Sequence, residues 1–196
     1  GLTMTESDEL YSLRNIYWLG NFQGAIKEAN TLTRCPAHLT TERDEFLYRA
    51  YLAQGQYDII FSEIGDGQDV PLALRALKQL AIYLSDPSSK ESSLQMLEGW
   101  IQEPNGGNNN TLLLVLAIAY THDGNLMGAI ELLHRGLNIE HSAFLVQLYL
   151  KIDRPDLAEK QLKLMKSVDE DCTLSMLCTA WVHLNSEGSK VQGKLI

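Results

Sequence analysis

A short turn between two apolar helical segments recurs along this chain, and it constrains the possible folds more than any other feature. The turn is GNFQGA at 20–25, GQYDII at 55–60, GNLMGA at 124–129 and DRPDLA at 153–158. Gly124 suits a helix C-terminus and Asn125 suits the N-cap of the next helix. Two helices joined by so short a turn must lie antiparallel. The sequence therefore predicts helical hairpins, with the small Gly128 and Ala129 pressed against the preceding helix.

The spacing of these turns predicts a repeat. The gap between the second and third turns is twice the usual one, so a further turn is expected near 86–91, where Ser88 and Glu91 have the spacing of a capping box. A period of about 34 residues is typical of tetratricopeptide repeats. We expect an all-α, tetratricopeptide-like solenoid with a right-handed superhelix, five full repeats and a partial sixth. The whole chain, 1–196, then forms a single domain.

Apolar periodicity gives approximate bounds for these helices. The first helix is expected over 6–19, the second hairpin from Thr40 and Thr41, and the third pair over about 70–103. The fifth hairpin joins 143–152 to 157–165, and the sixth begins near Glu170. A terminal repeat needs a polar cap or another neighbour, and the last residues provide neither. We therefore expect the natural protein to continue beyond Ile196.

Composition excludes several classes of function. The chain has 16 Lys and Arg against 25 Asp and Glu, a net charge of −9, which disfavours binding to a phosphate backbone. The longest apolar run, 112–120, is far shorter than the roughly 20 residues that span a bilayer. The 3 cysteines are odd in number and lack metal-ligand spacing, as expected in a reducing compartment. These features predict a soluble cytosolic protein that binds no nucleic acid and does not insert into membranes.

No motif in the sequence indicates catalysis, a metal or a cofactor. The glycine-rich 65–67 lacks the strand and the Gly-Lys-Ser of a phosphate loop, so we interpret it as a turn. His134 and His141 could share a helix face only if one helix spanned both, and a break near Asn138 argues against that. Each histidine is expected to be a surface or groove residue. The chain is therefore predicted not to be an enzyme.

The predicted binding surface is the concave groove lined by the first helix of each hairpin. An apolar groove with aromatic and arginine side chains suits an extended polypeptide. It lacks the Lys, Arg and Asn set with which chaperone-binding relatives grip a C-terminal carboxylate. The alternative is that many of these residues pack against neighbouring repeats. The candidate partner-binding residues, placed by fixed offsets from each turn, are Arg14, Tyr17, Trp18, Phe46, Arg49, Tyr83, Phe144 and Gln147.

Several segments are more specific than a generic repeat. ERDEFLYRAYLAQ at 42–54, KIDRPDLA at 151–158, DEDCTL at 169–174 and TAWV at 179–182 resemble the epsilon subunit family of coatomer, the COPI vesicle coat. The departures are the EPNGGNNN loop at 103–110 and the early end of the chain. The resemblance implies a non-catalytic coat subunit whose repeats embrace the C-terminal domain of the alpha subunit. It also implies a role in Golgi-to-endoplasmic-reticulum transport, in the cytoplasm and peripherally on Golgi and COPI vesicle membranes.

Two other functions remain open at this point. A free-standing cytosolic adaptor would capture short peptide tails, as co-chaperones do, whereas a coat subunit would bind a long partner segment tightly. An enzyme would need a site assembled from scattered residues. For the coat subunit we expect Trp18→Ala and Arg49→Ala each to weaken the complex with the alpha subunit by roughly 1–3 kcal/mol.

Overall fold

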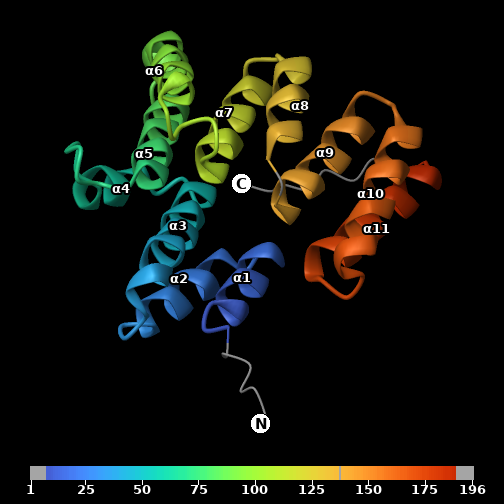
Figure 1. Ribbon diagram of the computed structural model, residues 1–196, viewed down its shortest axis with the longest axis horizontal. Helices are drawn as coiled ribbons and strands as arrows, with labels where there is room; N and C mark the ends of the chain where they lie inside the picture. The colour runs from blue at the N-terminus through green and yellow to red at the C-terminus, as the bar shows by residue number, and fades with distance from the viewer. Residues whose placement is uncertain (1–7, 137, 189–196) are drawn as a thin grey trace.

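The computed structural model describes residues 8–136 and 138–188, and these residues form eleven α-helices and one short 3-10 helix, with no strand among them (Figure 1). The predicted all-α class is confirmed. The helices are α1 (Tyr11–Trp18), α2 (Phe22–Thr31), α3 (Ala37–Ala53), α4 (Tyr57–Glu63), α5 (Leu72–Ser85), η1 (Pro87–Ser89), α6 (Lys90–Gln102), α7 (Asn110–His122), α8 (Leu126–Arg135), α9 (Ile139–Lys151), α10 (Pro155–Asp169) and α11 (Thr173–Ser186).

The helices follow one another along a curved path. Each helix contacts the next in the chain, and α1, α3, α5 and α7 also contact one another in turn. Beyond α7, α9 packs against α8, α10 and α11. The path bends so far that α11 comes back into contact with α1, which places the first and last of the described helices side by side (Figure 1). The handedness of a superhelix and the number of repeats stay predictions.

Two hairpin turns use the same set of small residues. Gly20 and Gly124 end the first helix of their hairpins with φ of 81° and 83°, a left-handed conformation that glycine adopts without strain. The following residues, Asn21 and Asn125, cap α2 and α8 by accepting a hydrogen bond from a backbone N–H three residues on. The predicted cap at Asn125 is confirmed.

Gly128 is small for a different reason than the one predicted. A Cβ at Gly128 would lie 2.5 Å from Nδ2 of Asn125, so this glycine makes room for the capping side chain rather than for α7. A Cβ at Gly24 would likewise lie 2.4 Å from Nδ2 of Asn21. Ala129, by contrast, is fully buried in the core shared with α7, as expected.

Three helix starts differ from the sequence prediction. Tyr11 begins α1, later than the predicted residue 6, and the Asp8 side chain accepts a hydrogen bond from the Leu10 N–H just before it. α3 begins directly after Pro36 rather than at 40, with Pro36 in an extended conformation at the N-cap. The expected turn near 86–91 is present, but Asp86 caps it instead of Ser88: its Oδ1 accepts from the Ser88 N–H at 3.0 Å.

The buried side chains form two cores. The smaller core joins α1, α2 and the middle of α3, and the larger runs from the end of α3 to α11. At the centre of the larger core, every residue of α7 from Leu112 to Ala119 is buried. This agrees with the apolar character of that segment on all sides of the helix.

Candidate functional site

Four of the eight predicted partner-binding residues lie together where α1 meets α3. The Arg49 guanidinium carbon lies 4.7 Å from the centre of the Tyr17 ring and 4.9 Å from that of Phe46, within the range of cation–π contacts. The Tyr17 and Phe46 rings meet edge to face at 5.3 Å, and the Trp18 ring lies 6.3 Å from Phe46. Tyr17, Phe46 and Arg49 are buried, whereas Trp18 is half-buried.

Sequence reasoning missed the residue that completes this cluster, Glu140 in the first turn of α9. Arg49 Nη1 donates to Glu140 Oε1 at 3.0 Å, and Nη2 donates to Oε2. The two side chains are 7% and 13% exposed, so the ion pair is largely withdrawn from water. It joins residues 91 positions apart, and no local pattern in the sequence marks such a pair.

The charges of this pair stabilise each other. Burial alone lowers the pKa of Arg49, but the attraction of Glu140 and its hydrogen bonds, together with Tyr17 and Glu45, outweigh burial and raise that pKa. Burial alone raises the pKa of Glu140, but the charge of Arg49 and its hydrogen bonds, together with smaller contributions from neighbouring groups, outweigh burial and lower that pKa. The nearby Trp18 indole N–H also lowers the pKa of Glu140. Its geometry falls short of a full hydrogen bond, since Trp18 Nε1 has no hydrogen-bond partner within the described residues. Both members of the pair are therefore charged at neutral pH.

The other predicted residues lie apart from this cluster. Arg14 in α1 donates from Nε to Glu42 Oε1 of α3 at 2.7 Å. Tyr83 is fully buried in α5, and its hydroxyl donates to the Ala119 carbonyl oxygen of α7 at 3.2 Å. Phe144 is buried in α9, and Gln147 is half-buried on the same helix.

A second polar contact holds the start of α9 against the start of α7. His141 is 1% exposed, so the prediction that it is a surface or groove residue is wrong. Its Nε2 lies 2.8 Å from the Asn110 carbonyl oxygen, which requires the proton on Nε2. Burial lowers the pKa of His141. A Cβ at Gly136 would fall 1.5 Å from His141 Nδ1, so only glycine fits beside this ring.

The break between His134 and His141 is confirmed, since the Asn138 side chain caps α9 by accepting from the His141 N–H at 2.9 Å. Nearby, Thr111 of α7 donates to the carboxylate of Glu45 on α3. Burial raises the pKa of Glu45, and the hydrogen bond from Thr111 opposes that rise. These contacts show that α3, α7 and α9 converge through polar groups.

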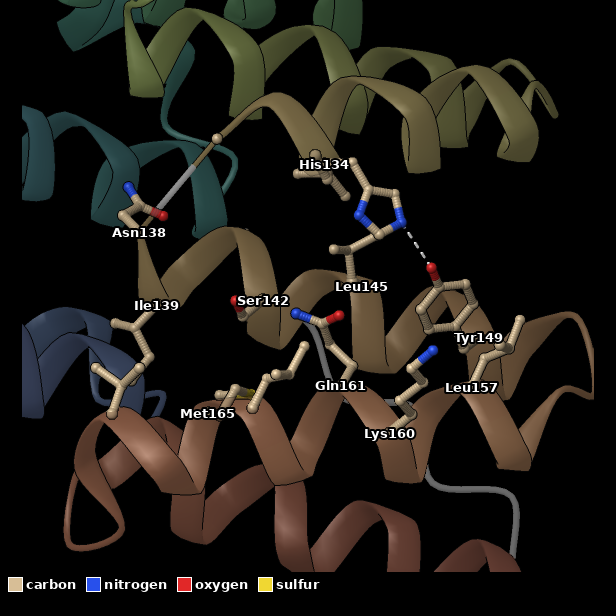
Figure 2. A pocket seen from close by; sticks show the side chains of 14 residues that line it. His134, Asn138, Ile139, Ser142, Leu145, Tyr149, Leu157, Lys160, Gln161 and Met165 are labelled. Carbon is tan, nitrogen blue, oxygen red and sulfur yellow. Dashed lines mark hydrogen bonds between the residues drawn. The ribbon is translucent and has the colours of Figure 1, made fainter.

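A pocket of about 490 Å³ lies elsewhere, between α8, α9 and α10 (Figure 2). His134 Nε2 and the Tyr149 hydroxyl form a hydrogen bond of 2.7 Å at one wall, and Lys160 and Gln161 rise from α10 toward α9. Leu164 and Val168 are exposed by 56% and 82% at its edge. The lining residues are Leu133, His134, Gly136, Asn138, Ile139, Ser142, Leu145, Tyr149, Leu157, Lys160, Gln161, Leu164, Met165 and Val168.

Neither a metal centre nor a membrane span is found in the part of the chain that the structure describes. No group of three or more His, Cys, Asp or Glu side chains there could hold a metal ion. No helix there is both long and apolar enough to cross a bilayer. Helical hairpins joined by a buried ion pair, with a pocket open between three of the helices, place the chain among all-helical hairpin proteins.

Comparison with known proteins identifies the scaffold. A family described as "Coatomer epsilon subunit" matches residues 6–195, so the chain belongs to the coatomer epsilon subunit family. This confirms the resemblance found in the sequence. Coatomer epsilon is a structural coat subunit, not an enzyme.

The regions aligned with individual relatives cover nearly all of this chain but only part of each relative. Coatomer subunit epsilon-1 of Arabidopsis thaliana is 38% identical over 190 residues, which is 97% of this chain and 64% of that protein. The epsilon subunit of Dictyostelium discoideum is 35% identical, covering 96% and 65%, and that of Caenorhabditis elegans is 30% identical, covering 96% and 64%. The chain thus spans a little under two thirds of the relatives it matches.

Proposed function

We propose that this chain is a non-catalytic scaffold of the COPI coat that binds the C-terminal domain of the coatomer alpha subunit. In that role it supports retrograde vesicle transport from the Golgi to the endoplasmic reticulum. It acts in the cytoplasm and associates peripherally with Golgi and COPI vesicle membranes through the coat. The observation that carries this proposal is the family match across residues 6–195.

The proposed binding surface is the concave face of a tetratricopeptide-like solenoid of five repeats and a partial sixth. The curved path that brings α11 back to α1 supports such a concave face. Arg14, Trp18 and Gln147 are only half-buried, so they are proposed to contact the partner directly. The buried candidates are proposed to hold the shape of that face: Tyr17, Phe46, Arg49, Tyr83 and Phe144.

Isothermal titration with the C-terminal domain of the alpha subunit tests the proposal. Trp18→Ala should weaken the complex by about 1–3 kcal/mol, because a large aromatic contact is lost at the interface. Trp100→Ala is the matched control: Trp100 is also half-buried, but it lies on α6 beside Arg75. Tight binding by the parent with a selective loss in Trp18→Ala supports the proposal. Absence of binding by the parent, or equal losses in both variants, contradicts it.

The alternative function is a free-standing adaptor for short peptide tails. It predicts micromolar binding of isolated C-terminal peptides and no preference for the alpha-subunit domain. Family membership favours the coat subunit, because every relative compared above is named as a coatomer epsilon subunit. Titration with tail peptides alongside the alpha-subunit domain separates the two functions.

A further inference from the structure

We propose that the pocket between α8, α9 and α10 is a second docking surface, which takes an amphipathic, acidic helix from a partner protein. None of the eight residues predicted for the alpha-subunit groove lines this pocket. The inference therefore does not rest on the proposed function, and its success or failure is independent of it.

The length of the pocket suits a helical segment. Its floor follows one face of α9 from Ile139 to Tyr149, a rise of about 15 Å along a helix axis. About three helical turns of a partner would cover that distance, enough to present anchors at i, i+4 and i+7. The volume of about 490 Å³ holds several apolar side chains and falls within the range of binding pockets.

The edge of the pocket exposes apolar surface that α10 does not bury in its own hairpin. Leu164 and Val168 are four residues apart and therefore lie on the same side of the helix. They are 56% and 82% exposed, among the most exposed large apolar side chains of the described residues. Adjacent exposed apolar side chains beside a cavity are typical of interaction sites.

The chemistry of the lining favours a helix over an extended peptide. Half of the residues that line the pocket carry aliphatic or Met side chains, and polar side chains such as Ser142 and Gln161 lie among them (Figure 2). An extended segment would bring backbone N–H and C=O groups that each need a partner in the lining. A helix satisfies these groups internally and can offer an apolar face.

The charge of the pocket lining indicates an acidic partner and argues against a second copy of this chain. The chain has a net charge of −9, yet no carboxylate lines this pocket, and Lys160 points into it without an ion-pair partner among the described residues. An acidic side chain beside the partner's apolar anchors would pair with Lys160. A two-fold dimer through this face would instead place two Lys160 side chains at one interface.

A designed peptide tests the surface directly. The probe is a helical peptide of about 18 residues with Leu at i, i+3, i+4 and i+7 and Glu beside them. Methyl NMR spectra of the protein should shift saturably on titration, at Ile139, Leu145, Leu157, Leu164 and Val168. A scrambled peptide of the same composition should cause no such shifts.

Two variants with matched controls locate the contact. Lys160→Glu should weaken binding roughly tenfold and should bind more tightly a peptide with Lys in place of Glu. Lys163→Glu makes the same charge change at an exposed position outside the lining and should leave binding unchanged. Val168→Asp should also weaken binding roughly tenfold, whereas Met127→Asp, at a side chain 69% exposed on α8, should not.

Several results would overturn the inference. These are the absence of saturable shifts at the pocket, equal binding of the scrambled peptide, or equal effects of Lys160→Glu and Lys163→Glu. The methyl signals of the protein without peptide could also shift with protein concentration. If Val168→Asp abolished those shifts, the pocket would be an interface with a second copy of the chain. Weaker binding of the alpha-subunit domain by Val168→Asp would make the pocket part of the first interface.

Discussion

α3 and α7 are both the first helices of their hairpins, yet their buried side chains differ in kind. The buried face of α7 from Leu112 to Ala119 is made of apolar side chains. α3 instead buries Arg49 against Glu140 of α9 and carries Glu45 into contact with Thr111. Apolar packing tolerates imperfect geometry, whereas a buried charge is stable only while its partner is present. The comparison shows that the first helix of a hairpin can be buried in two ways. It can contribute to a uniformly apolar core, or it can form a specific ion pair with a helix that is distant in the sequence.

The largest expected loss of stability comes from breaking the ion pair between Arg49 of α3 and Glu140. Arg49→Met should lower the free energy of unfolding by about 3–5 kcal/mol, because it leaves the Glu140 carboxylate buried without a counter-charge. Urea denaturation measures the loss. The double variant Arg49→Met with Glu140→Met should recover most of the stability, since an apolar pair can replace a buried ion pair. Losses that simply add in the double variant would show that the two charges are not coupled.

The corresponding change on α7 should be almost as costly. Leu113 is 1% exposed, and Leu113→Ala should destabilise by about 2–5 kcal/mol because it leaves a cavity in the larger core. Here no second substitution on α9 should restore the loss. If Glu140→Met rescued Leu113→Ala as well, the distinction between the two helices would fail.

A smaller effect is expected at the turn that follows α7. Gly124→Ala should cost about 1–2 kcal/mol, since φ at this position is 83° and a Cβ strains that conformation. Gly99→Ala is the control: Gly99 lies within α6, and its Cβ would meet nothing within 4 Å, so alanine should be neutral or stabilising. The melting temperatures of the two variants should shift in opposite directions or differ clearly. Equal melting temperatures would mean that the turn does not limit stability.

The smallest effect is a pH dependence confined to the α7–α9 contact. Burial lowers the pKa of His141, so the unfolded chain gains a proton below pH 6.5 that the folded chain does not. Stability should therefore fall as the pH falls, by at most about 0.7 kcal/mol between pH 7 and pH 6 for this single group. His141→Gln keeps a donor for the Asn110 carbonyl oxygen and should flatten the curve there. An unchanged slope would assign the pH dependence to other groups.

A further loss of stability in stronger acid belongs to Glu140. Arg49 holds the pKa of this carboxyl below its ordinary value, so its stabilising contribution is complete at neutral pH. The contribution is lost as the pH falls below the unfolded value of about 4.3 toward the folded one. In the Arg49→Met variant this loss should disappear from urea titrations at low pH.

The helical hairpins were predictable because their signals are local. The glycine-asparagine turns at 20–21 and 124–125 and the apolar run of α7 each lie within one stretch of sequence. The partner of Arg49 was not predictable, because Glu140 stands 91 residues away and only the packing of α9 brings it near. The burial of His141 was missed for the same reason. The pocket was not predictable either, because it requires three helices in place.

The contact between α1 and α11 has a consequence for how the molecule opens. In an array whose layers touch only their neighbours, the outermost helices can unravel independently. Here Thr173 of α11 donates a hydrogen bond to the Asn15 side chain of α1 across 158 positions. Neither helix can detach without also breaking this distant contact, so fraying at one end is thermodynamically linked to fraying at the other. Amide hydrogen exchange should then slow in parallel in both helices, and Thr173→Val should accelerate exchange in α1 as well as in α11.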